Sequence, residues 1–297
     1  MRRREAMLMA IPFPNIDPVL FSLDLGAFTF AIRWYALAYI VGLVLGWRLI
    51  IHLAGRDDLW GGRAPLTKQQ ADDLLTWMIL GVVLGGRLGY VLFYQPGYFL
   101  ANPLDALKIW QGGMSFHGGF AGVIVAVLIY ARKLGENPIR IGDAVALAAP
   151  IGLFFGRLAN FINAELWGRP TDAVWGVVFP NAPCGDGTHC ARHPSQLYEA
   201  ALEGLLLFII LAIAVWGFRS LRRPGLNIGI FLLGYGLARM FVEHFREADL
   251  QFISPDNPMG YVIRLGDLGL SMGQLLSLPM VIIGIILIAR ARRREAL

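Results

Sequence analysis

Charged residues are scarce in this sequence. Of its 297 residues, 16% are Asp, Glu, Lys or Arg and 56% are hydrophobic, whereas a typical soluble domain has roughly 25% charged residues. The low charge excludes an ordinary soluble domain and indicates a membrane protein. The chain also lacks an internal repeat and a pair of broken helices, which are the usual marks of a secondary transporter.

Cysteine is nearly absent as well. The two cysteines, Cys184 and Cys190, lie in the segment 163–196 and are separated by a flexible, glycine-containing stretch. A disulfide is one reading, if this segment faces an oxidising compartment. A metal site formed with His189 and His193 is the alternative. We expect no metal and no cofactor, and we expect neither cysteine to act as a nucleophile.

No cleavable signal peptide is expected, because the first apolar run starts late and lacks a small-residue cleavage pattern. Instead, seven runs of about 20 mainly apolar residues are long enough to cross a membrane as helices. They lie approximately at 28–50, 70–94, 117–134, 142–162, 197–217, 227–247 and 272–290. The sequence therefore predicts an all-α polytopic membrane protein with seven transmembrane helices.

This reading divides the chain into four parts. Residues 1–27 form an external N-terminal segment, and 28–162 hold the first four helices. Residues 163–196, in which 174–179 have a weakly strand-like pattern, form a small periplasmic cap. Residues 197–297 hold the last three helices and a basic cytoplasmic tail.

The orientation follows from the basic residues near the helix ends. An external N-terminus places thirteen Lys and Arg residues inside and seven outside, which favours N-terminus out and C-terminus in. The basic cluster 2–4 opposes this, unless later helices dominate or translation starts at Met7 or Met9. The net charge of +5 requires no nucleic acid, since the inner loops face anionic membrane lipid.

The stretch 156–171 follows an apolar run directly, so its polar residues lie inside the bilayer or at its edge if the run is a membrane helix. If it stays helical, Arg157, Asn160, Ala164 and Glu165 share one face. Gly168 then marks the end of the polar run. A snorkelling arginine with a capping asparagine is the simpler reading of such a helix end.

Polar residues recur at the same depth in other spans. Arg87 lies among three glycines and needs a carboxylate or an anion as a partner, because an arginine in a membrane costs roughly 2.5–3.5 kcal/mol. His117 lies between two glycine pairs, and Tyr35 opens the first span. Arg239 and Glu243 begin a second polar face that Arg246 and Glu247 continue, which could also be an internal ion-pair ladder.

With the N-terminus outside, Arg87, Arg157 and Arg239 all fall in the outer half of the bilayer. Unpaired, the three would cost about 8–10 kcal/mol, so internal carboxylates, an anion or both should compensate them. The headgroup of an outer-leaflet phospholipid is an available anion, and arginine forks match phosphate oxygens. The residues thus predict a lipid-phosphate site that faces outward.

The run from Gly156 to Gly168 also resembles the signature of the bacterial phosphatidylglycerol–prolipoprotein diacylglyceryl transferases. The stretches 112–119, 192–199, 234–243 and 271–274 are similar to further motifs of that family in the same order. The resemblance covers nearly the whole chain but not the N-terminal extension or the loop 172–191, which contains both cysteines. It implies transfer of the diacylglyceryl group of phosphatidylglycerol to the lipobox cysteine of a preprolipoprotein, at the outer face of the bacterial inner membrane.

That chemistry suggests roles for the polar residues. We expect Arg157 and Arg239 to hold the phosphate, with Asn160 donating to it and Glu165 or Glu243 fixing a guanidinium.

His117 is the first candidate for the base that takes the thiol proton, although a strong cationic field could form the thiolate without a base. Tyr35 would position the headgroup or the thiol, and Gly168 and Arg87 complete the lipid-binding set.

Two other classes of protein remain as alternatives. A transporter for an organic anion would also place arginines in a helix bundle, and a structural membrane scaffold would tolerate the ion pairs. The first lacks its expected repeats. The second gives no reason for polar groups from several spans to converge.

Overall fold

A computed structural model describes residues 10–24, 26, 29–182, 184, 190–248, 250–266 and 268–293. Within these residues, six helices are long and apolar enough to cross a membrane, and they coincide with six of the seven predicted spans. They are α2 (Trp34–Ala54), α4 (Lys68–Phe93), α6 (Phe116–Leu134), α7 (Pro138–Ile162), the continuous segment α8–η3–α9–η4 (Ser195–Gly217) and α11 (Met272–Arg293). The remaining predicted span forms α10 (Leu226–Val242), which is an apolar helix of only 17 residues.

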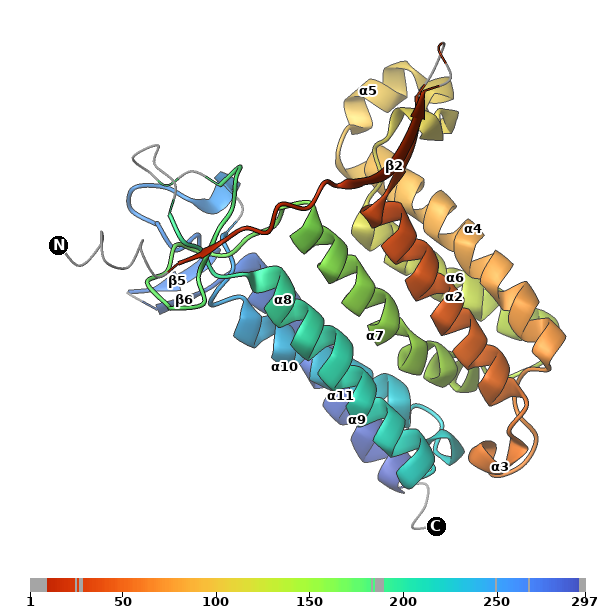
Figure 1. The fold of residues 1–297 in the computed structure, drawn as a ribbon. Coiled ribbons are helices and arrows are strands. Elements are labelled where there is room, and N and C mark those ends of the chain that lie inside the picture. Colours follow the sequence, from red (N-terminus) through yellow and green to blue (C-terminus); the bar gives the residue numbers. More distant parts are fainter. Residues whose placement is uncertain are drawn as a thin grey trace.

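The helices form two halves on either side of α7 (Figure 1). One half contains α2, α4 and α6, and the other contains α8, α9 (Leu207–Ala212), α10 and α11. The pairs that pack most extensively are α4 with α6, α10 with α11, and α2 with α7. The N-terminal segment and the β strands lie at one end of the bundle, here called the strand end, and the C-terminus lies at the opposite end (Figure 1).

The tightest helix contact joins α4 to α6 through glycines. A Cβ added at Gly81 or Gly85 would collide with the backbone of Gly122 or Gly118 on the facing helix. Glycine at these positions lets the two backbones touch, as is common between membrane helices. The close approach fixes the position of the first turn of α6, which carries His117.

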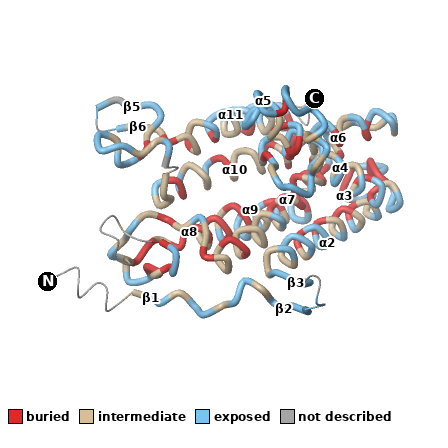
Figure 2. The backbone as a smooth tube through the Cα atoms, turned by 90° about the horizontal axis from the view of Figure 1, so that it is seen from above, coloured by how far each residue is buried: buried red, intermediate tan, exposed pale blue. Residues whose placement is uncertain are grey.

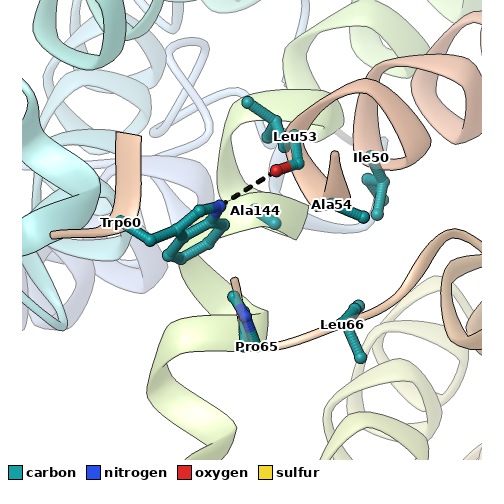
Figure 3. Close-up of a pocket in the computed structure, with 7 residues that line it drawn as sticks. All are labelled: Ile50, Leu53, Ala54, Trp60, Pro65, Leu66 and Ala144. Carbon is teal, nitrogen blue, oxygen red and sulfur yellow. Dashed lines mark hydrogen bonds between the residues drawn. The ribbon is translucent and has the colours of Figure 1, made fainter. Parts of the chain in front are cut away.

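Large apolar side chains fill the opposite end of the bundle. Leu53, Trp60, Leu147 and Leu211 belong to one buried cluster there, and the Trp60 indole N–H donates to the Leu53 carbonyl at 3.0 Å. Figure 3 shows a small apolar pocket beside this hydrogen bond, between α2, the stretch after it and α7. Its lining has no charged side chain, so it is not the predicted anion site.

Short strands and turns cover the strand end. The predicted strand within 174–179 forms as β4 (Val177–Val178), and it pairs in parallel with β1 (Ile11–Pro12). The strand β2 (Val19–Asp24) pairs with β3 (Thr29–Arg33) in an antiparallel hairpin that is exposed along its length (Figure 2). Because β3 occupies residues 29–33, the first helix starts at Trp34 rather than at the predicted residue 28.

The other elements are short. They are α3 (Asp57–Trp60), α5 (Pro96–Ala101), η1 (Pro103–Leu107), η2 (Ile109–Gln111), η5 (Ser220–Arg222), η6 (Leu250–Phe252), β5 (Ile263–Leu265) and β6 (Leu268–Leu270). The last two strands pair as an antiparallel hairpin.

The structure joins Cys184 and Cys190 in a disulfide. Both sulfurs are therefore engaged with each other, which argues against the alternative of a metal site formed with the two thiols. Of the two histidines in that alternative, His189 lies outside the described residues.

Candidate functional site

Three arginines meet on one buried carboxylate near the strand end. Glu199, in α8 (Ser195–Glu199), is 1% exposed. Its Oε2 lies 2.6 Å from Nε of Arg157, which α7 contributes. Its Oε1 lies 3.0 Å from Nη1 of Arg239 on α10 and 2.8 Å from Nη1 of Arg246, four residues after α10 ends.

A second carboxylate faces two of these arginines. Glu243, the C-cap of α10, lies 3.1 Å from Arg239 and 3.8 Å from Arg246. The predicted helical face that runs through residue 247 is wrong, because α10 stops at Val242. The chain turns there, so that Glu247 points to a different arginine, Arg192, at 2.6 Å.

The predicted span 142–162 ends where α7 ends, but the stretch after it does not continue as a helix. The helix ends at Ile162, and Ala164 and Leu166 adopt left-handed backbone angles with φ of 51° and 56°. The predicted helical face that includes Ala164 and Glu165 is therefore wrong. The turn nevertheless returns Glu165 to the helix, where its Oε1 accepts a hydrogen bond of 2.7 Å from the Asn160 amide.

Asn160 links this turn to the arginine cluster. Its Oδ1 accepts a hydrogen bond of 3.4 Å from Nη1 of Arg157. The hydroxyl of Tyr35 lies close enough to interact with Asn160 and Glu165, and it also shares a hydrogen bond of 3.2 Å with the Tyr39 hydroxyl. Among the predicted residues, Tyr35, Asn160, Glu165 and Arg157 thus form one continuous polar chain.

Gly168 joins three strand-end segments. Its N–H donates to the His193 carbonyl at 2.9 Å, and its carbonyl accepts from Arg192 at 3.1 Å. A Cβ at this position would come within 2.7 Å of the His193 carbonyl oxygen, and it would also collide with the Phe245 carbonyl. Glycine is therefore required where the chain after α7 meets the stretch that carries Arg246.

His193 itself is partly buried against aromatic rings. Its Nδ1 shares a hydrogen bond of 3.1 Å with the Tyr198 hydroxyl, and its ring meets Phe245 edge to face. Burial lowers the pKa of the His193 imidazole, since an apolar environment disfavours the charged form. The imidazole of His193 therefore lies in surroundings that favour its neutral form.

Arg87 occupies a different environment. Its guanidinium donates to the carbonyls of Asp105 at 2.6 Å, Ala106 at 2.8 Å and Gly112 at 2.6 Å. Its guanidinium carbon lies 5.2 Å from the centre of the Phe99 ring, in the range of a cation–π contact. The sequence predicts a carboxylate or an anion as the partner of Arg87. In the structure, backbone carbonyl groups accept the hydrogen bonds of its guanidinium instead.

His117 lies in the first turn of α6, where Ser115 caps the helix by accepting a hydrogen bond of 3.2 Å from the Gly118 N–H. The side chain of His117 is exposed. Helix α6, which carries His117, lies in the half of the bundle opposite to α8 and α10, with α7 between the halves (Figure 1).

Two site residues were missed by the sequence reasoning. Glu199 was noticed only as part of a motif, and Glu203, which is fully buried beside it, was not considered. Both stand in a strongly apolar span at a spacing of four residues, which places them on one helix face. Acidic residues inside a span are costly, and that signal could have identified them as partners of the arginines.

The arginine cluster has the chemistry of an anion site. Each guanidinium has five N–H donors, and the contacts described for Arg157, Arg239 and Arg246 use only some of them. The side chains of Arg157 and Arg239 are 19% and 15% exposed, so an incoming ligand can reach them. The fold and the site together define a multi-pass membrane protein with an arginine-rich anion site near one end of its helix bundle.

Comparison with known proteins makes the identification specific. The family model for prolipoprotein diacylglyceryl transferase matches residues 18–290, and the chain belongs to this family. It is 57% identical over 288 residues to a phosphatidylglycerol–prolipoprotein diacylglyceryl transferase of Cereibacter sphaeroides, with 95% of this chain and 98% of the relative covered. Proteins of the same name from Roseobacter denitrificans and Azospirillum brasilense are 55% and 52% identical, covering 96% and 97% of this chain and 99% of each relative.

Proposed function

We propose that this protein transfers the diacylglyceryl group of phosphatidylglycerol to the lipobox cysteine of a prolipoprotein, the first step of lipoprotein maturation. The cysteine sulfur forms a bond to a glycerol carbon, and the bond from that carbon to the phosphate oxygen breaks. Glycerol phosphate leaves with the electron pair, and the thiol proton passes to a base. The family and its relatives support the reaction, and the arginine cluster supports the place where it occurs.

The observation that carries this assignment is the meeting of Arg157 and Arg239 on Glu199. A leaving phosphate gains negative charge in the transition state, where fixed cations act most strongly. Glu199 and Glu243 hold the guanidinium groups in place before the lipid arrives. Their remaining N–H groups would then bind the phosphate oxygens in the forked geometry that arginine favours.

The neighbouring polar residues have supporting roles in this proposal. Asn160 would donate to the phosphate by exchanging its partner Glu165, and Tyr35 would position the headgroup or the thiol. Gly168 keeps the strand-end segments together, which fixes Arg246. Arg87 would act indirectly, by holding the segment 103–113 beside the lipid site, because carbonyl groups already engage its guanidinium.

The proposed orientation places the strand end at the outer face of the bacterial inner membrane, with seven crossings. Arg56, Arg63, Arg219 and Arg222 all lie near the opposite end, in α3, η5 and their connections, as expected for a cytoplasmic face. As the sixth crossing, α10 is short at about 25 Å. It packs extensively against α11 and also contacts α7, α9 and η3.

His117 is the proposed base for the thiol. Its exposed position in the first turn of α6 would let it face a peptide that enters between the two halves of the bundle. The variant His117→Gln keeps a polar side chain but cannot take up a proton at neutral pH. Near-normal turnover of this variant would exclude His117 as the base and leave thiolate formation to the cationic field.

The most informative experiment uses the purified full chain in detergent micelles that contain phosphatidylglycerol. A peptide with a lipobox cysteine is added, and its mass is followed. A gain equal to one diacylglyceryl group on the cysteine, with release of glycerol phosphate, is expected. No mass gain under conditions in which the protein remains folded would contradict the proposed function.

A further inference from the structure

Glu203 lies four residues after Glu199, on the π-helical turn η3 (Ala200–Leu206), and its side chain is fully buried. Gly204, the next residue, packs on α7 so closely that an added Cβ would come within 2.7 Å of Phe154 Cα. This contact keeps η3 against the helix that carries Arg157. Single π-helical turns within longer helices are frequent at functional sites.

The two buried glutamates have different surroundings. Glu199 has three arginines at 2.6, 2.8 and 3.0 Å. Within the part of the chain that the structure describes, neither carboxyl oxygen of Glu203 accepts a hydrogen bond, whereas Glu199 lacks one at Oε2 alone, which still lies 2.6 Å from Arg157 Nε. The ion pair of Glu203 with Arg157 is long, at 3.9 Å. An ionised carboxylate buried without donors costs several kcal/mol, so Glu203 is the carboxylate of this cluster that can most easily become neutral.

The charges of the cluster show when that would happen. Arg157, Arg239 and Arg246 carry three positive charges, and ionised Glu199 and Glu243 cancel two of them. One positive charge remains, which either an ionised Glu203 or a bound phosphate diester can cancel. Both together would leave a buried excess of negative charge, which is unfavourable in a low-dielectric site.

We propose that Glu203 is a positioning residue that couples lipid binding to the uptake of one proton. It balances the arginines as a carboxylate while the site is empty. When the phosphate of phosphatidylglycerol binds at Arg157 and Arg239, Glu203 takes a proton from water and becomes a neutral acid. An O–H bond forms on the carboxyl group and no other covalent bond changes. This inference rests on the proposed function, because it requires the lipid phosphate at these two arginines.

The charged and titratable groups that face Glu203 come from each element packed against it. They are Arg157 on α7, Glu199 on α8, Tyr235 and Arg239 on α10, and Arg246 after α10. The arginines stay charged throughout the accessible pH range, and three of them surround Glu199. Of the two glutamates, Glu203 has the longer contact with an arginine, so its ionisation is the less compensated one when a phosphate binds.

The test measures the binding of a soluble short-chain phosphatidylglycerol to the full-length protein in neutral detergent by titration calorimetry. Titrations at about pH 8.5, chosen on the alkaline side to favour an ionised Glu203 in the empty site, are repeated in two buffers of different ionisation enthalpy. We expect wild type to take up close to one proton per lipid bound. Its affinity should fall with rising pH by at most about tenfold per pH unit, because one proton is linked to binding.

The variant Glu203→Gln is expected to bind with less proton uptake than wild type and with a flatter dependence of affinity on pH. The matched control is Glu247→Gln, which removes a carboxylate that pairs with Arg192 outside the cluster and should behave like wild type. A structural role for Glu203 would change affinity but not the number of protons taken up.

Wild-type binding without proton uptake would overturn the inference, and this measurement needs no variant. Equal pH dependence of wild type and Glu203→Gln would overturn it as well. If wild type still transfers the diacylglyceryl group to the peptide after one of these two results, the proposed function stands. Only the coupling of lipid binding to proton uptake is then contradicted. If wild type neither binds the lipid nor modifies the peptide, both are contradicted.

Discussion

The two halves of the bundle bury arginine in opposite ways. In the half formed by α2, α4 and α6, Arg87 is 7% exposed and donates to the carbonyls of Asp105, Ala106 and Gly112. In the other half, Arg239 and Arg246 both contact the carboxylates of Glu199 and Glu243. Arg157 of α7 contacts Glu199 as well.

Under the proposed function, this difference distinguishes an arginine that holds the fold from arginines that bind the phosphate. Carbonyl oxygens of a folded segment are fixed acceptors, so Arg87 is held where it is and holds that segment in return. Carboxylates supply charge as well as acceptors, and a phosphate can compete for the same guanidinium edges. A partly exposed arginine that contacts carboxylates can therefore exchange one of them for a phosphate.

The largest expected effect comes from Arg157→Lys. The variant keeps the positive charge but loses the fork that spans Glu199 and the phosphate, and we expect turnover to fall by about 100-fold or more, as for the loss of one preorganised donor. Peptide modification followed by mass spectrometry measures it. Arg132→Lys, at an exposed position in the last turn of α6, is the matched control. Wild-type turnover of Arg157→Lys would refute forked phosphate recognition.

Arg87→Lys should show the opposite pattern. A lysine cannot reach the three carbonyls at once, so we expect a loss of about 2–3 kcal/mol in the free energy of unfolding. Turnover per folded molecule should change far less than for Arg157→Lys. Thermal unfolding in detergent and activity measured on the folded fraction separate the two effects. A stable but inactive Arg87→Lys protein would place Arg87 in the phosphate site.

Gly122→Ala tests the tight packing of the first half. The added methyl group would collide with the Gly81 backbone across the α4–α6 contact, and such overpacking costs about 1–3 kcal/mol. The matched control is Gly119→Ala on the same helix, where the nearest atom, the Val82 carbonyl oxygen, is 3.6 Å away. Equal melting temperatures for the two variants would show that the helices do not need the glycine contact.

The smallest effect is expected from the double variant Cys184→Ser and Cys190→Ser. The disulfide lies in a loop outside the arginine cluster, and the reaction uses the cysteine of the substrate. Turnover should therefore stay close to that of wild type in the mass assay. A folded but inactive double variant would show that the protein's own sulfur atoms take part in the reaction.

The spans could be predicted because an apolar run of about 20 residues is a sufficient physical signal for a membrane helix. The apolar run 142–162 ends at the same residue as α7, Ile162, but the path of the chain after it carried no such signal. Ala164 and Leu166 adopt left-handed angles that non-glycine residues rarely take, so the sequence could not indicate the turn that follows the helix. The contact between Asn160 and Glu165 depends on that turn.

The arginines of the candidate site could be predicted from the sequence, but the groups that contact them could not. Arg157 and Arg239 stand out because a charge in a span must be compensated. The carbonyls that engage Arg87 are backbone atoms, which any sequence contains, so only the folded segment 103–113 shows them. Glu199 could be found as an acid in an apolar span, but its contacts with three arginines depend on how α7, α8 and α10 meet.

The most direct measurement is an experimental structure of the protein with phosphatidylglycerol bound, determined in lipid nanodiscs. We expect phosphate oxygens within hydrogen-bonding distance, roughly 2.7–2.9 Å, of guanidinium nitrogens of both Arg157 and Arg239, with Glu199 still in contact with the cluster. A phosphate bound at Arg87, or at any position that contacts neither Arg157 nor Arg239, would contradict the assignment of the site.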